Sequence, residues 1–286
     1  MRTRNFIIFA LVFALIMCGT VFAQDVTKLR VVYQIPAVEK VIIKQDLVYK
    51  TRDGKDLTFD LNYPPDFKGE VRLPVVIIVL GYADDVFQGP LKNLAVNKDW
   101  AKLFAASGMA AINYSTHTPA TDIHDLILHI RENAESLDLD ADTIGLWSCS
   151  GNVVNALTFL MDERKEYLKC AALYYGIMLT PDQKYMDTIL QFNKMVKLSI
   201  EGLDKIQNFH QDLPLLIVRA GKDREDINRT LDYFVSQAVS NNVPLTLINY
   251  TEGRHAFDGL DDNDRSREII RQTLNFMRSN LLKKDK

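Results

Sequence analysis

The feature that most constrains this chain is a buried-strand pattern that stops at a group of small residues and continues as a helix pattern. Residues 143–153 read Thr-Ile-Gly-Leu-Trp-Ser-Cys-Ser-Gly-Asn-Val. A strand that turns sharply into a helix with a nucleophilic side chain at the corner is a nucleophile elbow, whose strained backbone exposes that side chain above the sheet. An ordinary strand-to-helix turn with a polar helix cap is the alternative interpretation.

Three residues of this corner are possible nucleophiles, and crowding there favours small neighbours two positions before and after the right one. Ser150 has the small Ser148 before it, although Asn152 after it is larger than glycine. Cys149 would place the bulky Trp147 in the leading position, and Ser148 as nucleophile would shorten the strand. The small-neighbour requirement favours Ser150, with Cys149 as the alternative nucleophile.

Strand patterns alternate with helix patterns along most of the chain. The Asp-Gly pair at residues 53–54 lies between two alternating runs and predicts an antiparallel hairpin. The later strands are continuous apolar runs, which are typical of a parallel sheet covered on both faces. We therefore predict an α/β fold, a mostly parallel open sheet with helices on both faces and an N-terminal hairpin. Predicted strands are 41–50, 57–63, 75–80, 110–114, the elbow strand, 170–175, 215–218 and 245–250; predicted helices are 100–106, 122–134, 152–160, 181–209, 226–240 and 265–282.

Two further polar residues each follow a predicted strand, and together with the elbow serine they give the chain order Ser, Asp, His. Asp223 follows the strand at 215–218, and His255 follows the last strand. Ligands collect at the carboxyl ends of parallel strands, and the chain order Ser, Asp, His is one way of building a hydrolytic triad. His255 would take the proton of Ser150, and Asp223 would orient the imidazole. Asp226 lies close enough in sequence to compete for the acidic role.

Residues at the predicted strand ends could also stabilise the negatively charged oxygen that forms when a nucleophile attacks a carbonyl group. Tyr82 follows the strand at 75–80, and Gly151 follows the proposed nucleophile. Their backbone N–H groups are predicted to form an oxyanion hole. The helical histidines lack metal-ligand spacing to nearby carboxylates, so we expect no metal and no cofactor.

The first 23 residues have the pattern of a secretory signal peptide. A basic start is followed by an apolar run at 6–18 and a small-x-small cleavage site at 21–23. The apolar run is short for a membrane-spanning helix. An uncleaved membrane anchor is the alternative interpretation. We expect an exported, periplasmic or secreted protein with one domain at 24–286 and no stable membrane span. Removal of two arginines leaves 32 basic and 37 acidic residues, a charge of −5, which offers no footprint for nucleic acid.

Taken together, these motifs resemble the α/β-hydrolase superfamily, and most closely its dienelactone hydrolase-like group. The resemblance covers nearly the whole mature chain and implies a Ser150–Asp223–His255 triad that hydrolyses esters or lactones. Members named for the group use a cysteine, whereas the matching position here is Ser150, and Asn152 stands where the family has glycine. The motifs that carry it are 75–81, 100–108, the elbow, 221–223 and 253–257.

Three functions are compatible with these residues. The first is a serine hydrolase for a small-molecule carboxylic ester, with short acyl groups preferred because 176–213 must supply both a covering helix and any lid. The second is a peptidase or acyl-peptide hydrolase, since the same triad cleaves amides. The third is a catalytically weak binding protein on a hydrolase scaffold, suggested by Asn152 at the elbow.

Overall fold

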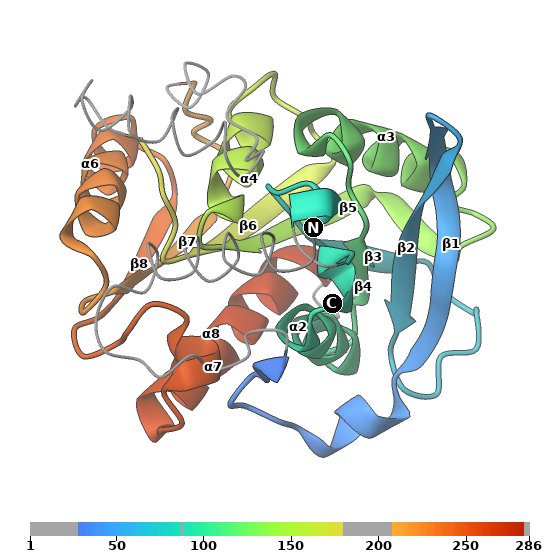
Figure 1. Ribbon diagram of the computed structural model, residues 1–286, viewed down its shortest axis with the longest axis horizontal. Coiled ribbons are helices and arrows are strands. Elements are labelled where there is room, and N and C mark those ends of the chain that lie inside the picture. Colours follow the sequence, from blue (N-terminus) through green and yellow to red (C-terminus); the bar gives the residue numbers. More distant parts are fainter. Residues whose placement is uncertain (1–27, 87–88, 180–207, 283–286) are drawn as a thin grey trace, which may run out of the picture.

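The computed structural model describes residues 28–86, 89–179 and 208–282. The predicted signal peptide and most of the predicted helix at 181–209 lie outside the described residues. The described chain forms an eight-stranded sheet with the strand order β1-β2-β4-β3-β5-β6-β7-β8 (Figure 1). None of its described helices is long and apolar enough to cross a membrane.

The sheet begins with the predicted antiparallel hairpin. β1 (Ile42–Arg52) pairs with β2 (Lys55–Tyr63), and Arg52 lies opposite Lys55 across the turn. Both turn residues have positive φ angles, 51° at Asp53 and 72° at Gly54, as a two-residue type I′ turn requires. β2 then pairs antiparallel with β4 (Ala110–Tyr114). The N-terminal hairpin is therefore confirmed.

The rest of the sheet is parallel from β4 to the edge strand β8. Its central strands are buried along most of their length, which explains why they read as unbroken apolar runs. The predicted fold class is confirmed. The strands are β3 (Leu73–Ile78), β5 (Leu139–Cys149), β6 (Leu168–Tyr174), β7 (Leu215–Ala220) and β8 (Leu245–Tyr250).

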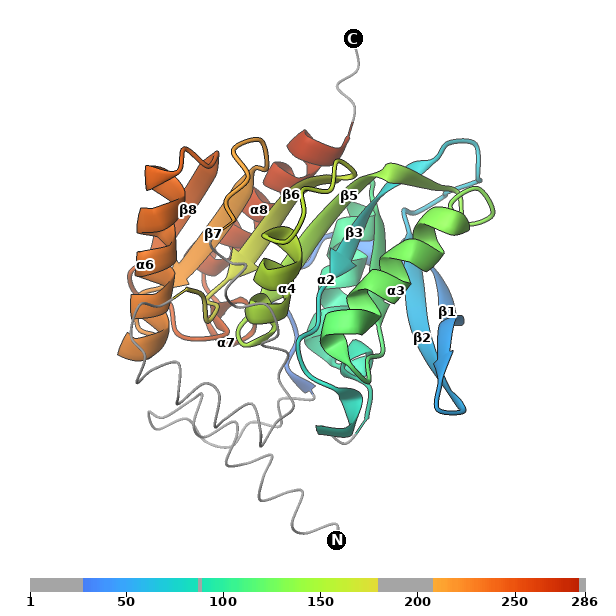
Figure 2. The same cartoon turned by 90° about the horizontal axis from the view of Figure 1, so that it is seen from above.

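Helices cover both faces of the sheet. α3 (Pro119–Glu132), α4 (Asn152–Leu160) and α6 (Glu225–Ser240) lie on one face, and α2 (Ala95–Ala106) and α8 (Asp264–Leu281) lie on the other (Figures 1 and 2). α3 begins three residues before its predicted start, because a proline is well suited to the first turn of a helix. α2 begins five residues early, ahead of its apolar run. Shorter helical segments are Pro36–Lys40, Asp84–Val86, Leu91–Asn93 and α7 (Phe257–Leu260).

The last helix packs tightly against the elbow strand. An added Cβ at Gly145 of β5 would lie 2.8 Å from Cε of Met277 and 2.9 Å from Cδ1 of Leu281, both on α8. Beneath the same strand, the rings of Trp100 and Trp147 lie 4.6 Å apart in the core. Glycine at 145 therefore lets α8 approach the strand that carries Ser150.

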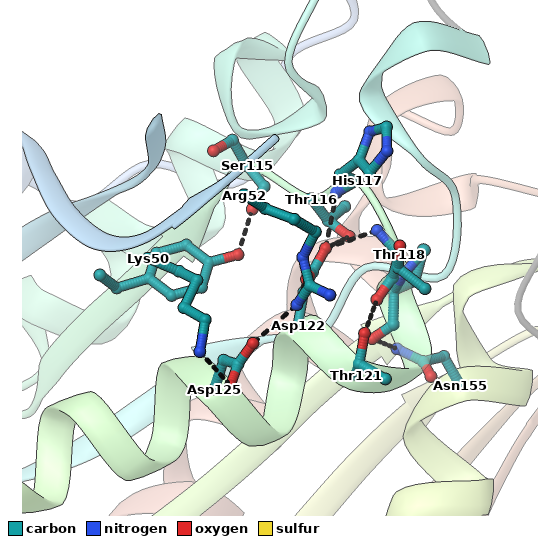
Figure 3. A network of polar contacts seen from close by, with 12 residues as sticks. Lys50, Arg52, Ser115, Thr116, His117, Thr118, Thr121, Asp122, Asp125 and Asn155 are labelled. Atoms are coloured by element: carbon teal, nitrogen blue, oxygen red, sulfur yellow. Dashed lines mark hydrogen bonds and ion pairs between the residues drawn. The ribbon is translucent and has the colours of Figure 1, made fainter. Parts of the chain in front are cut away.

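A buried carboxylate organises the loop between β4 and α3. Asp122 accepts hydrogen bonds from the main-chain N–H groups of His117 and Thr118, both at 2.6 Å, and pairs with Arg52 of β1 at 2.9 Å (Figure 3). His117, three residues after the end of β4, has an exposed side chain. The network fixes the loop rather than exposing a reactive group.

The segment before β1 is attached to α7 and to α2. The main-chain N–H of Val32 donates to the carbonyl of Asp258 at 2.8 Å. Arg30 pairs with Asp99 of α2 through two hydrogen bonds of 2.6 and 2.7 Å. Close packing accompanies these bonds, because an added Cβ at Gly259 would lie 2.6 Å from Cγ of Leu29. The start of the described chain thus forms part of the structure around α7.

Candidate active site

Ser150 sits at the corner between β5 and α4 in a conformation that its residue type disfavours. Its φ angle is 57°, and its main-chain N–H donates to the carbonyl of Tyr174 at 2.9 Å. A Cβ makes the left-handed region costly, by about 1–2 kcal/mol per residue. The strand, the serine and the helix therefore follow one another as the sequence predicts, and the neighbouring strand β6 holds the strained residue in place.

The side chains of Ser150, His255 and Asp223 form one hydrogen-bonded chain. Oγ of Ser150 lies 2.8 Å from Nε2 of His255, and Nδ1 of His255 lies 2.6 Å from Oδ2 of Asp223. The side chain of His255 is 8% exposed and that of Asp223 is 1% exposed. With the imidazole proton on Nδ1, Nε2 can accept the serine proton as Oγ attacks an electrophile.

Two loops meet closely to bring the aspartate to the histidine. An added Cβ at Gly221 would lie 2.3 Å from the carbonyl oxygen of Thr251, so only glycine fits where the loops after β7 and β8 touch. The N–H of Lys222 donates to the carbonyl of Gly253 at 2.9 Å and joins the same loops. The second oxygen of Asp223 accepts from the N–H of Arg224 at 2.7 Å, which fixes the carboxylate.

The other residues considered from sequence have different surroundings. Burial raises the pKa of the Cys149 thiol, which keeps it in the poorly nucleophilic protonated form. The Ser148 hydroxyl is buried and donates to the carbonyl of Val79 at 3.1 Å. Asp226 pairs with Arg224 and accepts from the N–H of Ile227 at 3.0 Å at the start of α6. Within the described residues, His255 is hydrogen-bonded to Ser150 and Asp223, the two candidates that the sequence favours.

The proposed N–H donors lie where the end of β3 meets the elbow. The N–H of Gly81 donates to Oδ1 of Asn152 at 2.8 Å and is therefore already bound. The next N–H along the loop is that of Tyr82. The Tyr82 ring packs on the elbow, because an added Cβ at Gly151 would lie 1.9 Å from its hydroxyl oxygen. Gly151 therefore has to lack a side chain, and the Tyr82 side chain lies against it, while the oxyanion role of the two N–H groups stays a prediction.

A second buried carboxylate lies beneath the histidine and was missed in the sequence. The Tyr175 ring centre lies 4.8 Å from that of His255, and its hydroxyl donates to Asp258 at 2.5 Å. Asp258 also accepts from Nε1 of Trp100 at 2.8 Å, and burial raises its pKa. Its only sequence signal is its position three residues after His255, in a segment that gives no sign of burial.

The described ranges contain no group of three His, Cys, Asp or Glu side chains arranged to hold a metal ion. A scan against models of protein families and a search of curated proteins found no match to this chain. Solved structures, in contrast, match over most of its length.

Several of the similar structures are esterases. Native esterase 2 of Thermogutta terrifontis matches with a TM-score of 0.67 at 17% identity, covering 88% of this chain and 97% of that one. Its propionate-bound form gives a TM-score of 0.65 at 17% identity, covering 87% and 98%. An inhibited esterase B from Lactobacillus rhamnosis gives 0.67 at 15% identity, covering 86% and 89%. This chain has the α/β-hydrolase fold. At such low identities the likeness establishes the fold, and the function has to be argued from the site.

Proposed function

We propose that this protein is a serine hydrolase that cleaves small carboxylic esters or lactones. The observation that carries the proposal is the hydrogen-bonded chain from Ser150 through His255 to Asp223, with the serine held at a positive φ angle. Strain of this kind at a nucleophile keeps the side chain positioned for attack.

In the proposed reaction, Oγ of Ser150 bonds to the carbonyl carbon of the ester while its proton passes to Nε2 of His255. The carbonyl electron pair moves to oxygen, and the N–H groups of Tyr82 and Gly151 stabilise this oxyanion. Collapse breaks the bond to the alcohol oxygen, which takes the proton from His255. Water then attacks the acyl carbon while His255 takes its proton, and collapse of this second intermediate breaks the bond to Oγ of Ser150, which regains the proton from His255 as the acid leaves.

The structural neighbours support an ester as the substrate. Esterase 2 of Thermogutta terrifontis has been crystallised with propionate and with butyrate, and also phosphonylated by sarin. Acids of three and four carbons agree with the expectation that acetyl to butyryl esters are the preferred substrates here. Longer chains would need an apolar surface worth about 0.8 kcal/mol per buried methylene.

The proposal includes two finer points that rest on the sequence. The motifs at 100–108 and 253–257 favour the dienelactone hydrolase-like group within the hydrolases. The pattern at 1–23 favours export, which would set the enzyme to work on esters outside the cytoplasm.

Labelling with a fluorophosphonate probe tests the proposal directly. The wild-type protein and Cys149→Ala should gain one adduct, located at residue 150 by mass spectrometry, while Ser150→Ala should gain none. Turnover of p-nitrophenyl esters should then fall from butyrate to laurate, and aminoacyl amides should be poor substrates. An unlabelled wild-type protein would favour a binding role, and faster amide cleavage would favour a peptidase.

A further inference from the structure

Two asparagines of α4 hold a single peptide unit at the end of β3. Asn152 and Asn155 lie three residues apart and so share a face of the helix. Oδ1 of Asn152 accepts from the N–H of Gly81 at 2.8 Å, and Nδ2 of Asn155 donates to the carbonyl of Leu80 at 2.7 Å. These two groups belong to the same peptide bond, so both of its polar atoms are bound by side chains of the elbow helix.

The position of this peptide matters for the proposed reaction, because Tyr82 follows it directly. Glycine at 81 leaves the backbone free to adopt many conformations, so the N–H of Tyr82 needs an external restraint to keep one direction. Rotation of the Leu80–Gly81 peptide would have to break both asparagine bonds at once. The peptide is thereby fixed relative to α4.

Asn152 also connects the two proposed oxyanion donors. Its main chain follows Gly151, one donor, and its side chain binds the residue that precedes Tyr82, the other. Asn155 is buried, 1% exposed, and also donates to the carbonyl of Pro119 at 3.2 Å, which ties it to the first turn of α3 (Figure 3). The pair is therefore braced against a second helix.

We propose that Asn152 and Asn155 are positioning residues that set the separation and direction of the Tyr82 and Gly151 N–H groups. The inference rests on the proposed function and extends it. It also gives the asparagine at the elbow a role that glycine could not perform, since glycine has no side chain to reach β3. Removal of one oxyanion donor typically lowers kcat about 10²–10³-fold, so a displaced donor should cost less, about 10–100-fold.

The test uses the full-length protein and a trifluoromethyl ketone with a short alkyl chain. Such a ketone adds Oγ of Ser150 to its carbonyl carbon and leaves an oxyanion in the hole, so its Ki reports the donors without turnover. Asn152→Ala should lower kcat for p-nitrophenyl acetate about 10–100-fold and raise Ki by the same factor, with KM almost unchanged. Because both asparagines hold one peptide, the double variant with Asn155→Ala should be little worse than either single one.

Asn62→Ala is the matched control. Asn62 is buried and donates to the carbonyl of Ala111 at 3.2 Å, on the β2–β4 pair away from the elbow. This variant should lower the melting temperature and leave kcat and Ki within about twofold of wild type. If the buried Asn155→Ala does not fold, Asn152→Ala carries the test alone, since Asn152 is only half-buried.

The outcomes separate this inference from the proposed function. Wild-type protein that is labelled by fluorophosphonate, with Asn152→Ala retaining wild-type kcat and Ki, would overturn the positioning role alone. A rise in KM with unchanged kcat would assign Asn152 to substrate binding and would also overturn it. Failure of the wild type to react with fluorophosphonate would reject the proposed function and this inference with it.

Discussion

Backbone strain is distributed differently in the turns and at the carboxyl edge of the parallel strands. Among the described residues, those with positive φ in turns and in a bulge of β1, where the pairing with β2 shifts register between Lys44 and Leu47, are Asp or Asn apart from glycine; both tolerate that conformation. At the carboxyl edge they are Ser, Tyr and Ala, which do not. In the turns the residue type supplies the conformation, whereas at the edge packing imposes it. The first group is Asp46, Asp53, Asp66, Asp138 and Asn242, and the second is Ser150, Tyr175 and Ala256.

The pKa shifts of three carboxyl groups also differ between the β1 bulge and the carboxyl edge. In the bulge, hydrogen bonding and attraction to Lys92 lower the pKa of Asp46. In the loop that follows β3, burial raises the pKa of Asp84 to about 6, and burial also raises that of Asp258. The ionised form of Asp46 is thus stabilised by its partner, while the ionised forms of Asp84 and Asp258 are disfavoured by desolvation.

The largest expected effect comes from replacing Ser150 in two ways. Ser150→Ala and Ser150→Gly should both lose ester turnover by about 10⁴-fold or more, because both lack the hydroxyl. Only glycine also relieves the positive φ angle, so Ser150→Gly should be more stable than Ser150→Ala by about 1 kcal/mol in urea unfolding. Equal stability of the two variants would contradict imposed strain at the elbow. Cys149→Ala should keep most activity.

Gly151→Ala should have the next largest effect. Its Cβ would lie 1.9 Å from the hydroxyl oxygen of Tyr82, so the ring and the loop after β3 must move. We expect a loss of kcat of about 10²–10³-fold, comparable to removal of an oxyanion donor. Gly54→Ala in the hairpin is the matched control, since it meets nothing within 4 Å although its φ is +72°. Gly54→Ala should lose stability and keep kcat. A loss of kcat in this variant would contradict the claim that the effect of Gly151→Ala is specific to the elbow.

Asp84 should make stability depend on pH. Its folded pKa of about 6 lies above the ordinary value of 3.8, so the native state binds more protons than the unfolded state between these values. The free energy of unfolding should therefore fall as pH rises from about 4 to 6, by at most about 3 kcal/mol, and change little above. The measurement is urea unfolding of wild type and Asp84→Asn at each pH. A constant difference between the two would show that Asp84 does not titrate in this range.

Ala256→Gly should have the smallest effect of the set, and a favourable one. Ala256 has φ 58° and ψ 35° beside His255, and glycine adopts this region without the Cβ penalty. We expect a gain of about 1 kcal/mol in the free energy of unfolding. Asp53→Asn in the hairpin turn, where the residue type already suits the conformation, should change stability by less than about 0.5 kcal/mol. Destabilisation by Ala256→Gly would mean that the Ala256 methyl group contributes more packing than strain.

Much of this structure was predictable because it depends on local patterns. Unbroken apolar runs predicted the parallel strands, and the Asp-Gly pair predicted the hairpin. Ser150, Asp223 and His255 could be selected because each follows a strand, and strand ends converge in a parallel sheet. The first turns of α2 and α3 were missed because they precede the apolar residues that define the helix pattern.

The remaining features depend on contacts between distant segments. The Asn152 bond to Gly81 and the Tyr175 bond to Asp258 each join residues that no local pattern relates. Asn152 looked like a defect of the elbow because sequence inspection judged its size and not its hydrogen bonds. Its side chain in fact binds the neighbouring strand end.

The attachment of the segment before β1 has a consequence for the order of folding. Val32 is bonded to Asp258, three residues after His255, so one of the first described residues depends on a residue that follows every strand of the sheet. Contacts of such long sequence separation form late, because the intervening chain must be ordered first. During synthesis the central strands can pair before α8 exists, while Val32 cannot make its bond until residue 258 has been added. A nascent chain could therefore pair the central strands β3, β5 and β6 before His255 is available to bond to Ser150.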